Sequence, residues 1–208
     1  MYMRLTRVQS SPDQIDQTIT NFTGEVIPVA QRAPGYAGAA IYVNRQTGQA
    51  AGVTFWESAR ALAASELMGI DTRTQAAEAT GLNIVDVARF QIVHIDRAQP
   101  LRTPAYTRVD NGFMPPERLD AFADFIRDDV TPELRRRKGY LWMTTGVDRT
   151  SGVVAVTSNW ETAEDRELAD PSFAPVLQRA GEFGLMPIRI DFYEQAVLEL
   201  LQPLTSRP

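Results

Sequence analysis

The stretch RQTGQAAGVTFWES, residues 45–58, closes a run of small and β-branched residues with a tryptophan and a glutamate. It returns as RTSGVVAVTSNWET, residues 149–162, so that Trp160 stands 104 residues after Trp56 (160 − 56 = 104). A glycine turn followed by such a run predicts the second strand of a β-hairpin. The chain therefore builds one local structure twice.

The similarity continues on both sides of this hairpin. The same offset of 104 relates Gly35-Tyr36 to Gly139-Tyr140 and Pro28 to Pro132. Nearer the ends the alignment slips, and there we pair Arg7-Val8 with Arg108-Val109. An internal period of about 100 residues predicts two domains, a first repeat at 1–98 and a second at 99–208. The join is RAQPLRTP, residues 97–104, and LTSRP forms a loose tail.

Each repeat shows the same order of expected elements. A short strand (3–8 or 105–109) precedes an amphipathic helix that Pro28 or Pro132 interrupts near its end, because proline lacks the N–H and clashes with the preceding turn. A hairpin follows, beginning at residues 36–44 or 140–148. A second helix then leads to a last strand at 84–95 or 187–197. The order β-α-β-β-α-β is that of the ferredoxin-like fold, an α+β class.

Such a unit has an antiparallel sheet with helices on one face, so its other face needs a cover. Two copies in one chain supply that cover by packing sheet to sheet, as a pseudo-dimeric α/β barrel. We therefore expect an intramolecular pseudo-dimer of tandem ferredoxin-like repeats. A further homodimer of the whole chain is left open.

Composition narrows the classes of function. The 208 residues carry a net charge of −5, which disfavours binding to nucleic acid because that needs a basic patch. The absence of cysteine excludes disulfides, thiolate metal sites and cysteine nucleophiles, and His94 is the single histidine. No signal peptide and no run of about 18 apolar residues is present, so we expect no membrane partner and a cytoplasmic location.

Two longer segments carry a resemblance to a known family. They are EVIPVAQRAPGYAGAAIYVNRQTGQAAGVTFWES, residues 25–58, and DVTPELRRRKGYLWMTTGVDRTSGVVAVTSNWET, residues 129–162. Each resembles the antibiotic biosynthesis monooxygenase-like members of the dimeric α/β-barrel superfamily. The resemblance covers nearly the whole chain, once per half, and it implies the fold more specifically than an activity. The superfamily mixes cofactor-free oxygenases, haem-degrading enzymes and proteins with no known reaction.

Only part of the family pattern transfers to this chain. Trp56 and Trp160 match the family's tryptophan, which in the oxygenases stands beside a pocket asparagine and a histidine or tyrosine. Haem-degrading members use a helix histidine as iron ligand, whereas His94 falls in an expected strand. The resemblance therefore implies no haem, and we expect no metal and no cofactor.

Two roles remain open for each candidate side chain. Trp56 and Trp160 either close the corner between strand and helix as large buried side chains or take part in chemistry. Arg7 and Arg108 either pair with a carboxylate at the barrel rim or bind an anion.

Strict strand alternation places Tyr36, Gly38, Ala40 and Tyr42 on one face of the first copy, which we expect to look into the barrel. On the matching face Trp142 stands where the first copy has Gly38. We therefore expect Trp142 to plug the second half, and any ligand to lie in the first half near Trp56. The candidate pocket residues, with no catalytic residue assigned among them, are Arg7, Tyr36, Gly38, Tyr42, Thr54, Trp56, Arg108 and Trp142.

Two functions of different classes follow. The first is a cofactor-independent monooxygenase acting on a small aromatic or polyketide-like molecule, whose anion reduces dioxygen itself. In that case Arg7 or Arg108 supplies positive charge, Tyr36, Tyr42, Tyr140 or Tyr193 supplies hydrogen bonds, and Trp56 forms a wall. The second is a non-catalytic barrel that binds a small apolar ligand or serves as an interaction module.

Overall fold

The structure is a computed structural model, and it describes residues 1–201. The expected tail, LTSRP, lies outside the described residues. None of the helices described in this range is both long and apolar enough to cross a membrane.

The first half of the chain forms four strands and four α-helices with short helical turns between them. In chain order these elements are β1 (Tyr2–Gln9), a 3₁₀ turn (Pro12–Gln14), α1 (Ile15–Asn21), a π-helical turn η2 (Phe22–Val26), α2 (Ile27–Gln31), β2 (Tyr36–Asn44), β3 (Gln49–Trp56), α3 (Ala59–Ala64), α4 (Glu66–Thr80) and β4 (Asn83–Arg97).

The second half repeats this order. Its elements are β5 (Ala105–Phe113), a 3₁₀ turn (Pro116–Arg118), α5 (Leu119–Phe125), a π-helical turn η4 (Ile126–Val130), α6 (Thr131–Leu134), β6 (Tyr140–Val147), β7 (Val153–Trp160), α7 (Ala163–Ala169), a 3₁₀ turn η5 (Asp170–Ser172), α8 (Phe173–Glu182) and β8 (Met186–Leu200).

The two helix prolines lie beyond π-helical turns. Pro28 follows η2, in which the N–H of Ile27 donates to the carbonyl of Phe22, one residue further back than in an α-helix. Pro132 follows η4 in the same way, with the N–H of Thr131 donating to Ile126. Each proline therefore does not end the helix. The helix has a wider π-helical turn before the proline and then continues in a short α segment.

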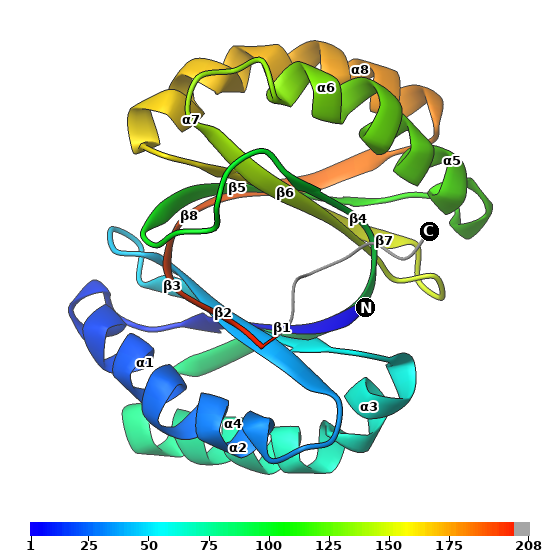
Figure 1. The fold of residues 1–208 in the computed structure, drawn as a ribbon. Coiled ribbons are helices and arrows are strands. Elements are labelled where there is room, and N and C mark those ends of the chain that lie inside the picture. The colour runs from blue at the N-terminus through cyan, green and yellow to red at the C-terminus, as the bar shows by residue number, and fades with distance from the viewer. Residues whose placement is uncertain (202–208) are drawn as a thin grey trace. The chain divides into compact units, whose positions relative to one another are not determined.

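The strands follow the order β1-β3-β2-β8-β5-β7-β6-β4 and close into an antiparallel barrel (Figure 1). The hairpin strands β2 and β3 pair antiparallel, as do β6 and β7. The α+β class and the pseudo-dimeric ferredoxin-like α/β barrel predicted from the sequence are thereby confirmed.

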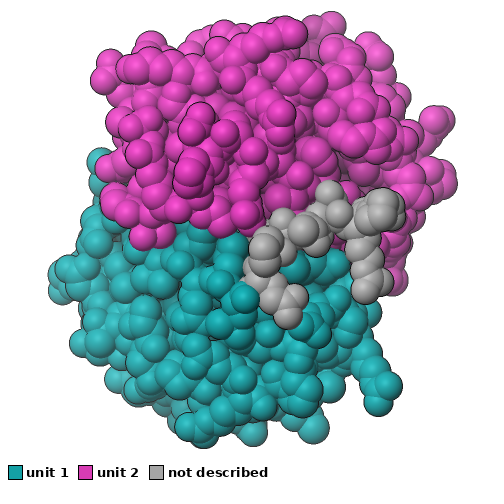
Figure 2. Space-filling model, viewed as in Figure 1, with its two compact units in different colours: residues 1–89, 193–204 teal, residues 90–192, 205–208 magenta. Residues whose placement is uncertain are grey.

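The chain divides into two compact units (Figure 2). The unit built mainly from the first half of the sequence also contains the end of β8, and the other unit also contains the end of β4. Within the described residues, unit 1 contains residues 1–89 and 193–201, and unit 2 contains residues 90–192. The division falls inside β4 and inside β8. The end of β8 pairs with β2 in unit 1, and the end of β4 pairs with β6 in unit 2. The compact units therefore do not coincide with the sequence segments 1–98 and 99–208.

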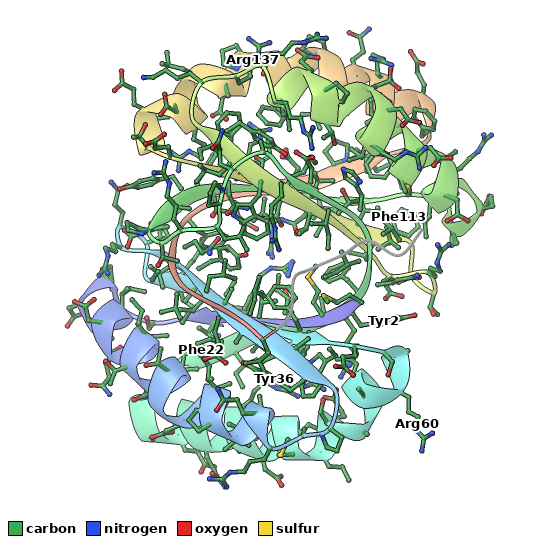
Figure 3. All side chains as sticks on the ribbon, in the orientation of Figure 1. Tyr2, Phe22, Tyr36, Arg60, Phe113 and Arg137 are labelled. Atoms are coloured by element: carbon green, nitrogen blue, oxygen red, sulfur yellow. The ribbon has the colours of Figure 1, made fainter. Side chains whose placement is uncertain are left out.

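In each unit the core lies between the sheet and its helices. In unit 1 it contains Ile15 from α1, Phe22 from η2, and Ile41 and Trp56 from the sheet. Figure 3 shows Phe22 and Tyr36 pointing into this layer, whereas Arg60 on α3 points away from it. The apolar residues Ile15 and Ile27 of α1 and α2 are buried there, as the periodicity of this segment in the sequence predicts, whereas α4 buries only Ala76 and exposes Leu67 and Ile70.

The hairpin turns need their glycines. Gly48 has φ +76°, and a Cβ atom on it would lie 2.1 Å from the carbonyl oxygen of Ser10. Gly152 has φ +77° and meets the carbonyl oxygen of Met114 at the same distance. Since only glycine adopts this conformation without strain, the turn is fixed identically in both hairpins.

Candidate functional site

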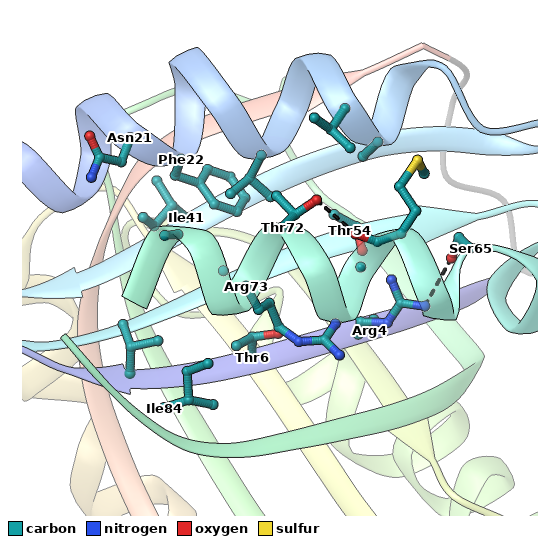
Figure 4. A pocket seen from close by; sticks show the side chains of 18 of the residues that line it. Arg4, Thr6, Asn21, Phe22, Ile41, Thr54, Ser65, Thr72, Arg73 and Ile84 are labelled. Atoms are coloured by element: carbon teal, nitrogen blue, oxygen red, sulfur yellow. Dashed lines mark hydrogen bonds between the residues drawn. The ribbon is translucent and has the colours of Figure 1, made fainter. Parts of the chain in front are cut away.

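A cavity with a volume of about 100 Å³ lies in unit 1 between the sheet and the helical layer. Its floor comes from alternate residues of β1 and β3, and its roof from α1, η2, α2 and α4 (Figure 4). Most of the lining is apolar, and Arg4, Ser65 and Arg73 lie toward one end of it, away from Asn21 (Figure 4). Its lining includes Arg4, Thr6, Phe22, Ile41, Thr54, Trp56, Ser65, Met68, Gly69 and Arg73.

Two of the eight expected pocket residues, Thr54 and Trp56, line this cavity. Arg7 does not, because Arg4, Thr6 and Val8 occupy the cavity side of β1 and adjacent residues of a strand face opposite ways. Arg7 pairs instead with Asp86 at 2.9 Å. Gly38 and Tyr42 are also outside the lining among the described residues.

A β-bulge between Tyr36 and Gly38 corrects the strand alternation on which we relied. Tyr36 packs in the core on the helix side with Ala39 and Ile41, so it does not share a face with Gly38 and Tyr42. The Tyr36 hydroxyl donates to Glu199 at 3.2 Å, and burial raises the pKa of Tyr36. Tyr42 instead contacts the ring of Tyr193, 6.4 Å away between centroids.

The register of the strands also corrects the pairing of the arginines. Arg4 lies opposite Thr54, two residues before Trp56, and Arg108 lies opposite Ser158, two residues before Trp160. Arg108 therefore corresponds to Arg4, not to Arg7. The sequence already contained this correspondence, since 108 − 4 = 104 is also the offset between the tryptophans. We aligned Arg108 with Arg7 instead because a valine follows both arginines.

Arg4 is a buried cation in the lining of the cavity, with 5% of its surface exposed. Its Nη2 donates to the Leu62 carbonyl at 3.0 Å, to Ser65 Oγ at 2.9 Å and to Glu66 Oε2 at 3.0 Å. Its Nε–H is buried and has no hydrogen-bond partner among residues 1–201. A buried donor without a partner is costly, and a ligand acceptor would satisfy it.

Glu66 is the shared counter-ion of three arginines. Its carboxylate lies 3.0 Å from Arg4, 2.9 Å from Arg73 and 2.8 Å from Arg89. Although burial opposes it, hydrogen bonds from Arg89 and Arg73 hold the pKa of Glu66 below its usual value. Burial lowers the pKa of Arg4. One carboxylate for three guanidinium groups leaves this end of the cavity positively charged.

Trp56 forms the wall next to Arg4. Its indole N–H donates to Thr54 Oγ1 at 3.0 Å, and its ring lies edge-on to Tyr36 at 5.9 Å. The guanidinium carbon of Arg4 is 5.7 Å from the centre of the Trp56 ring, within the range of a cation–π interaction. Trp56 is thus a buried core residue whose surface also faces the cavity.

Unit 2 contains the same arrangement around Trp160. The indole N–H donates to Ser158 Oγ at 3.2 Å, and the ring lies edge-on to Tyr140 at 5.6 Å. Arg108, however, has two carboxylates, Asp110 and Asp170, at 2.7 and 2.8 Å. Burial alone would lower the pKa of Arg108, but the hydrogen bonds that Arg108 donates to these aspartates raise its pKa above the usual value.

A phenylalanine covers the arginine of unit 2. The ring of Phe173 lies 4.1 Å from the guanidinium carbon of Arg108. In unit 1 the position 104 residues earlier is Gly69, and a Cβ there would lie only 2.8 Å from Arg4 Nη1 and 3.0 Å from Arg73 Nη1. The cavity of unit 2 is correspondingly smaller, about 50 Å³, and its lining does not include Arg108 among the described residues.

Trp142 lies on β6 and is fully buried. It is not part of the core between the sheet and helices of unit 2, which contains Tyr140 and Met143 instead. A bulge between Tyr140 and Trp142 shifts the alternation in β6 as it does in β2. Trp142 therefore lies outside the linings of both helix-side cavities among the described residues.

His94, the single histidine, is buried in unit 2. Its Nε2 lies 2.9 Å from Thr131 Oγ1, whose own hydroxyl donates to the Ile126 carbonyl. Burial lowers the pKa of His94 below its usual value of 6.5, against the opposing effect of Asp96. The neighbouring charged groups also include Arg127, Arg135 and Asp128.

We predict that the free energy of unfolding falls as the pH drops below about 6.5. The folded pKa of His94 is depressed, so the unfolded chain binds the proton first, and stability present above 6.5 is lost on acidification. The loss has an upper limit of about 1.4 kcal/mol per pH unit. Urea unfolding at pH 7.5 and 5.5 measures it, with His94→Gln as the control that removes this dependence. An unchanged dependence in that variant would contradict the prediction.

Comparisons with known proteins agree with the fold. No family model matches the chain. The chain is 25% identical over 185 residues to "Uncharacterized protein Rv2557" of Mycobacterium tuberculosis (strain ATCC 25618 / H37Rv), covering 87% of this chain and 82% of the relative. It is also 25% identical over 205 residues to "Uncharacterized protein Rv2558" of the same strain, covering 98% and 86%.

Three solved structures resemble the chain over nearly its whole length. An anthrone oxidase-like protein has a TM-score of 0.70 at 12% identity, covering 100% of this chain and 97% of the other. A ferredoxin fold protein related to antibiotic biosynthesis monooxygenases, from Listeria monocytogenes, has a TM-score of 0.53 at 7% identity, covering 94% and 95%. A heme-degrading enzyme of L. monocytogenes has a TM-score of 0.52 at 8% identity, covering 93% and 99%. The protein thus has the dimeric α/β-barrel fold of monooxygenase-like proteins.

The residues of the cavity do not fit haem. The lining of the unit 1 cavity contains no histidine, cysteine or tyrosine among the described residues, and Met68 is its one sulfur donor. His94 belongs to unit 2 and is held by Thr131. Within residues 1–201 no group of three or more His, Cys, Asp or Glu side chains is placed to hold a metal ion.

Proposed function

We propose that the cavity of unit 1 binds a small, largely apolar molecule and holds it for oxidation by dioxygen without a cofactor. The observation that carries the proposal is the buried cation Arg4 in the lining of a mostly apolar cavity, next to Trp56. Fixed positive charge in a dry site stabilises an anion far better than it does in water. The likeness to an anthrone oxidase-like protein supports this chemistry by analogy of fold only.

The reaction requires a substrate that becomes a carbanion or its enolate. That anion gives an electron to dioxygen, and the two radicals combine to a peroxide, which takes up the proton that the substrate released. Loss of water from a hydroperoxide on a carbon that still bears hydrogen leaves a ketone. One oxygen atom enters the product and the other leaves in water, so no external reductant is needed. The role of Arg4 is to stabilise the anion, and the role of the apolar walls is to exclude water.

A second function, binding without turnover, is favoured by one observation. No aspartate, glutamate or histidine lines the unit 1 cavity among the described residues, and the nearby Glu66 is held ionised by three arginines. General-base catalysis needs a group whose pKa is near the working pH. Oxidation in this cavity is therefore limited to substrates acidic enough to ionise beside Arg4 without a protein base.

Oxygen uptake distinguishes the two functions. The purified protein is incubated with a panel of hydroxylated aromatic and 1,3-dicarbonyl compounds in buffer containing a metal chelator. Uptake above the rate without protein, with one water formed per dioxygen consumed, supports oxidation. Saturable binding of the same compounds without uptake leaves only the binding function.

We predict different effects for the two tryptophans. Trp56→Phe removes the indole from the cavity wall and is expected to weaken ligand binding or oxygen uptake at least tenfold. Trp160→Phe is expected to leave both within twofold, because Phe173 and two aspartates already close the site in unit 2. Calorimetry and oxygen uptake on the two variants, which lose the same indole, check this. Equal losses would contradict it.

A further inference from the structure

The two matched arginines differ in what neutralises them. Asp110 accepts from Arg108 Nε at 2.8 Å and from its Nη2 at 2.7 Å, so a carboxylate covers one edge of that guanidinium. The residue 104 positions earlier, Thr6, lies on the cavity side of β1 two residues after Arg4 and carries no charge. The Nε–H that Asp110 satisfies in unit 2 is the one without a partner in the described part of unit 1.

The charge balance differs in the same sense. In unit 2 two carboxylates face one guanidinium group, whereas in unit 1 one carboxylate faces three. Arg4 and Arg73 both approach the backbone of Gly69, where no side chain separates them from the cavity. Unit 1 is therefore short of a negative charge at the position where unit 2 has the carboxylate of Asp110.

We propose that the ligand of the unit 1 cavity carries an oxyanion, a carboxylate or an enolate, that takes the place of Asp110. The oxyanion accepts from the Nε–H of Arg4 and lies beside Arg73, and the apolar remainder of the ligand packs against Phe22, Ile41 and Met68. This rests on the proposed function, because it names the substrate class of the same cavity.

The geometry favours a small oxyanion. Asp110 accepts from both Nε and Nη2 of Arg108. Nη2 of Arg4 already donates to protein acceptors, so one oxygen of the ligand accepts from the Nε–H of Arg4 alone. A cavity of about 100 Å³ limits the apolar part to about one ring. Arg4 is also 95% buried, so the ion pair forms out of water, where it is least screened.

Calorimetric titration with matched probes tests the proposal. Benzoate is compared with benzamide for the carboxylate, and 1,3-cyclohexanedione, an enolate at neutral pH, is compared with cyclohexanone. We expect at least one anion to bind at least tenfold more tightly than its neutral counterpart. The probe that binds identifies which oxyanion the cavity takes.

Thr6→Asp is the decisive variant, because it gives Arg4 an internal counter-ion in the position of Asp110. It should abolish the preference for the anion while keeping or raising the melting temperature. Thr6→Asn has the same shape without the charge and should retain the preference, which excludes a steric effect. Equal binding of anion and neutral probe, no binding of either anion, or an undiminished preference in Thr6→Asp would overturn the proposal.

The outcomes also separate this inference from the proposed function. If anions bind, Thr6→Asp abolishes that binding, and no compound of the panel causes oxygen uptake, the oxyanion site is supported and the proposed oxidation is refuted. Oxygen uptake with no preference for anions overturns the oxyanion site and retains the oxidation.

Discussion

Gly38→Ala is expected to lower the free energy of unfolding by about 3 kcal/mol. A Cβ on Gly38 would lie 2.3 Å from the carbonyl oxygen of Glu199 and 3.1 Å from the Cα of Leu200, and its φ of +153° disfavours any side chain. Backbone atoms of a paired strand cannot move aside as the end of a flexible side chain can. Urea denaturation followed by circular dichroism measures the loss.

Gly24→Ala is the matched control. Gly24 lies in the π-helical turn η2, and nothing stands within 4 Å of a Cβ placed there. It should be neutral or stabilise by about 0.5 kcal/mol, because alanine restricts the unfolded chain. If Gly38→Ala proved as stable as Gly24→Ala, β8 could not be paired with β2 as described.

Removing the buried arginine should affect the two units unequally. Arg108→Met leaves Asp110 and Asp170 without their shared partner, and we expect a loss of about 3 kcal/mol in the free energy of unfolding. Arg4→Met leaves Glu66 paired with Arg73 and Arg89 and removes a donor that lacked a partner in residues 1–201. We expect that variant to lose about 1 kcal/mol or less.

Both arginines are nearly buried and both are replaced by the same apolar side chain, so each variant is the control for the other. Unfolding at low and at moderate salt checks the comparison, because a buried pair is screened little. A larger loss for Arg4→Met than for Arg108→Met would contradict the view that Arg108 stabilises the fold and Arg4 serves the cavity.

The fold could be predicted because its signals are local and occur twice. The glycine turns at Gly48 and Gly152, the tryptophans 104 residues apart and the apolar periodicity of the helices each require a particular backbone or burial, and they agree with one another. The split of β4 and β8 between the compact units could not be predicted, because the sequence of a long strand does not show which neighbours pair with its two ends.

The site was predictable only in part. Thr54 and Trp56 followed from the resemblance and the strand pattern. The face assignment of Tyr36 failed because one extra residue in a strand reverses every side chain before it, and no residue type announces a bulge. Gly38, which we expected on a ligand pocket, instead lies against the backbone of β8, which comes too close to leave space for a Cβ atom. Gly69 and Arg73 were not predicted, because a glycine and an arginine on a helix form no sequence motif that marks a binding site.

Placing both arginine sites on one chain has a genetic consequence. In an assembly of two identical chains, a substitution such as glycine to phenylalanine over the arginine would appear in both sites at once, and closing one site would close the other. Here Gly69 and Phe173 are encoded separately, so each can be inherited without the other. One arginine is thereby free to hold the fold while its counterpart keeps an open cavity, a division of labour that a symmetric assembly does not permit.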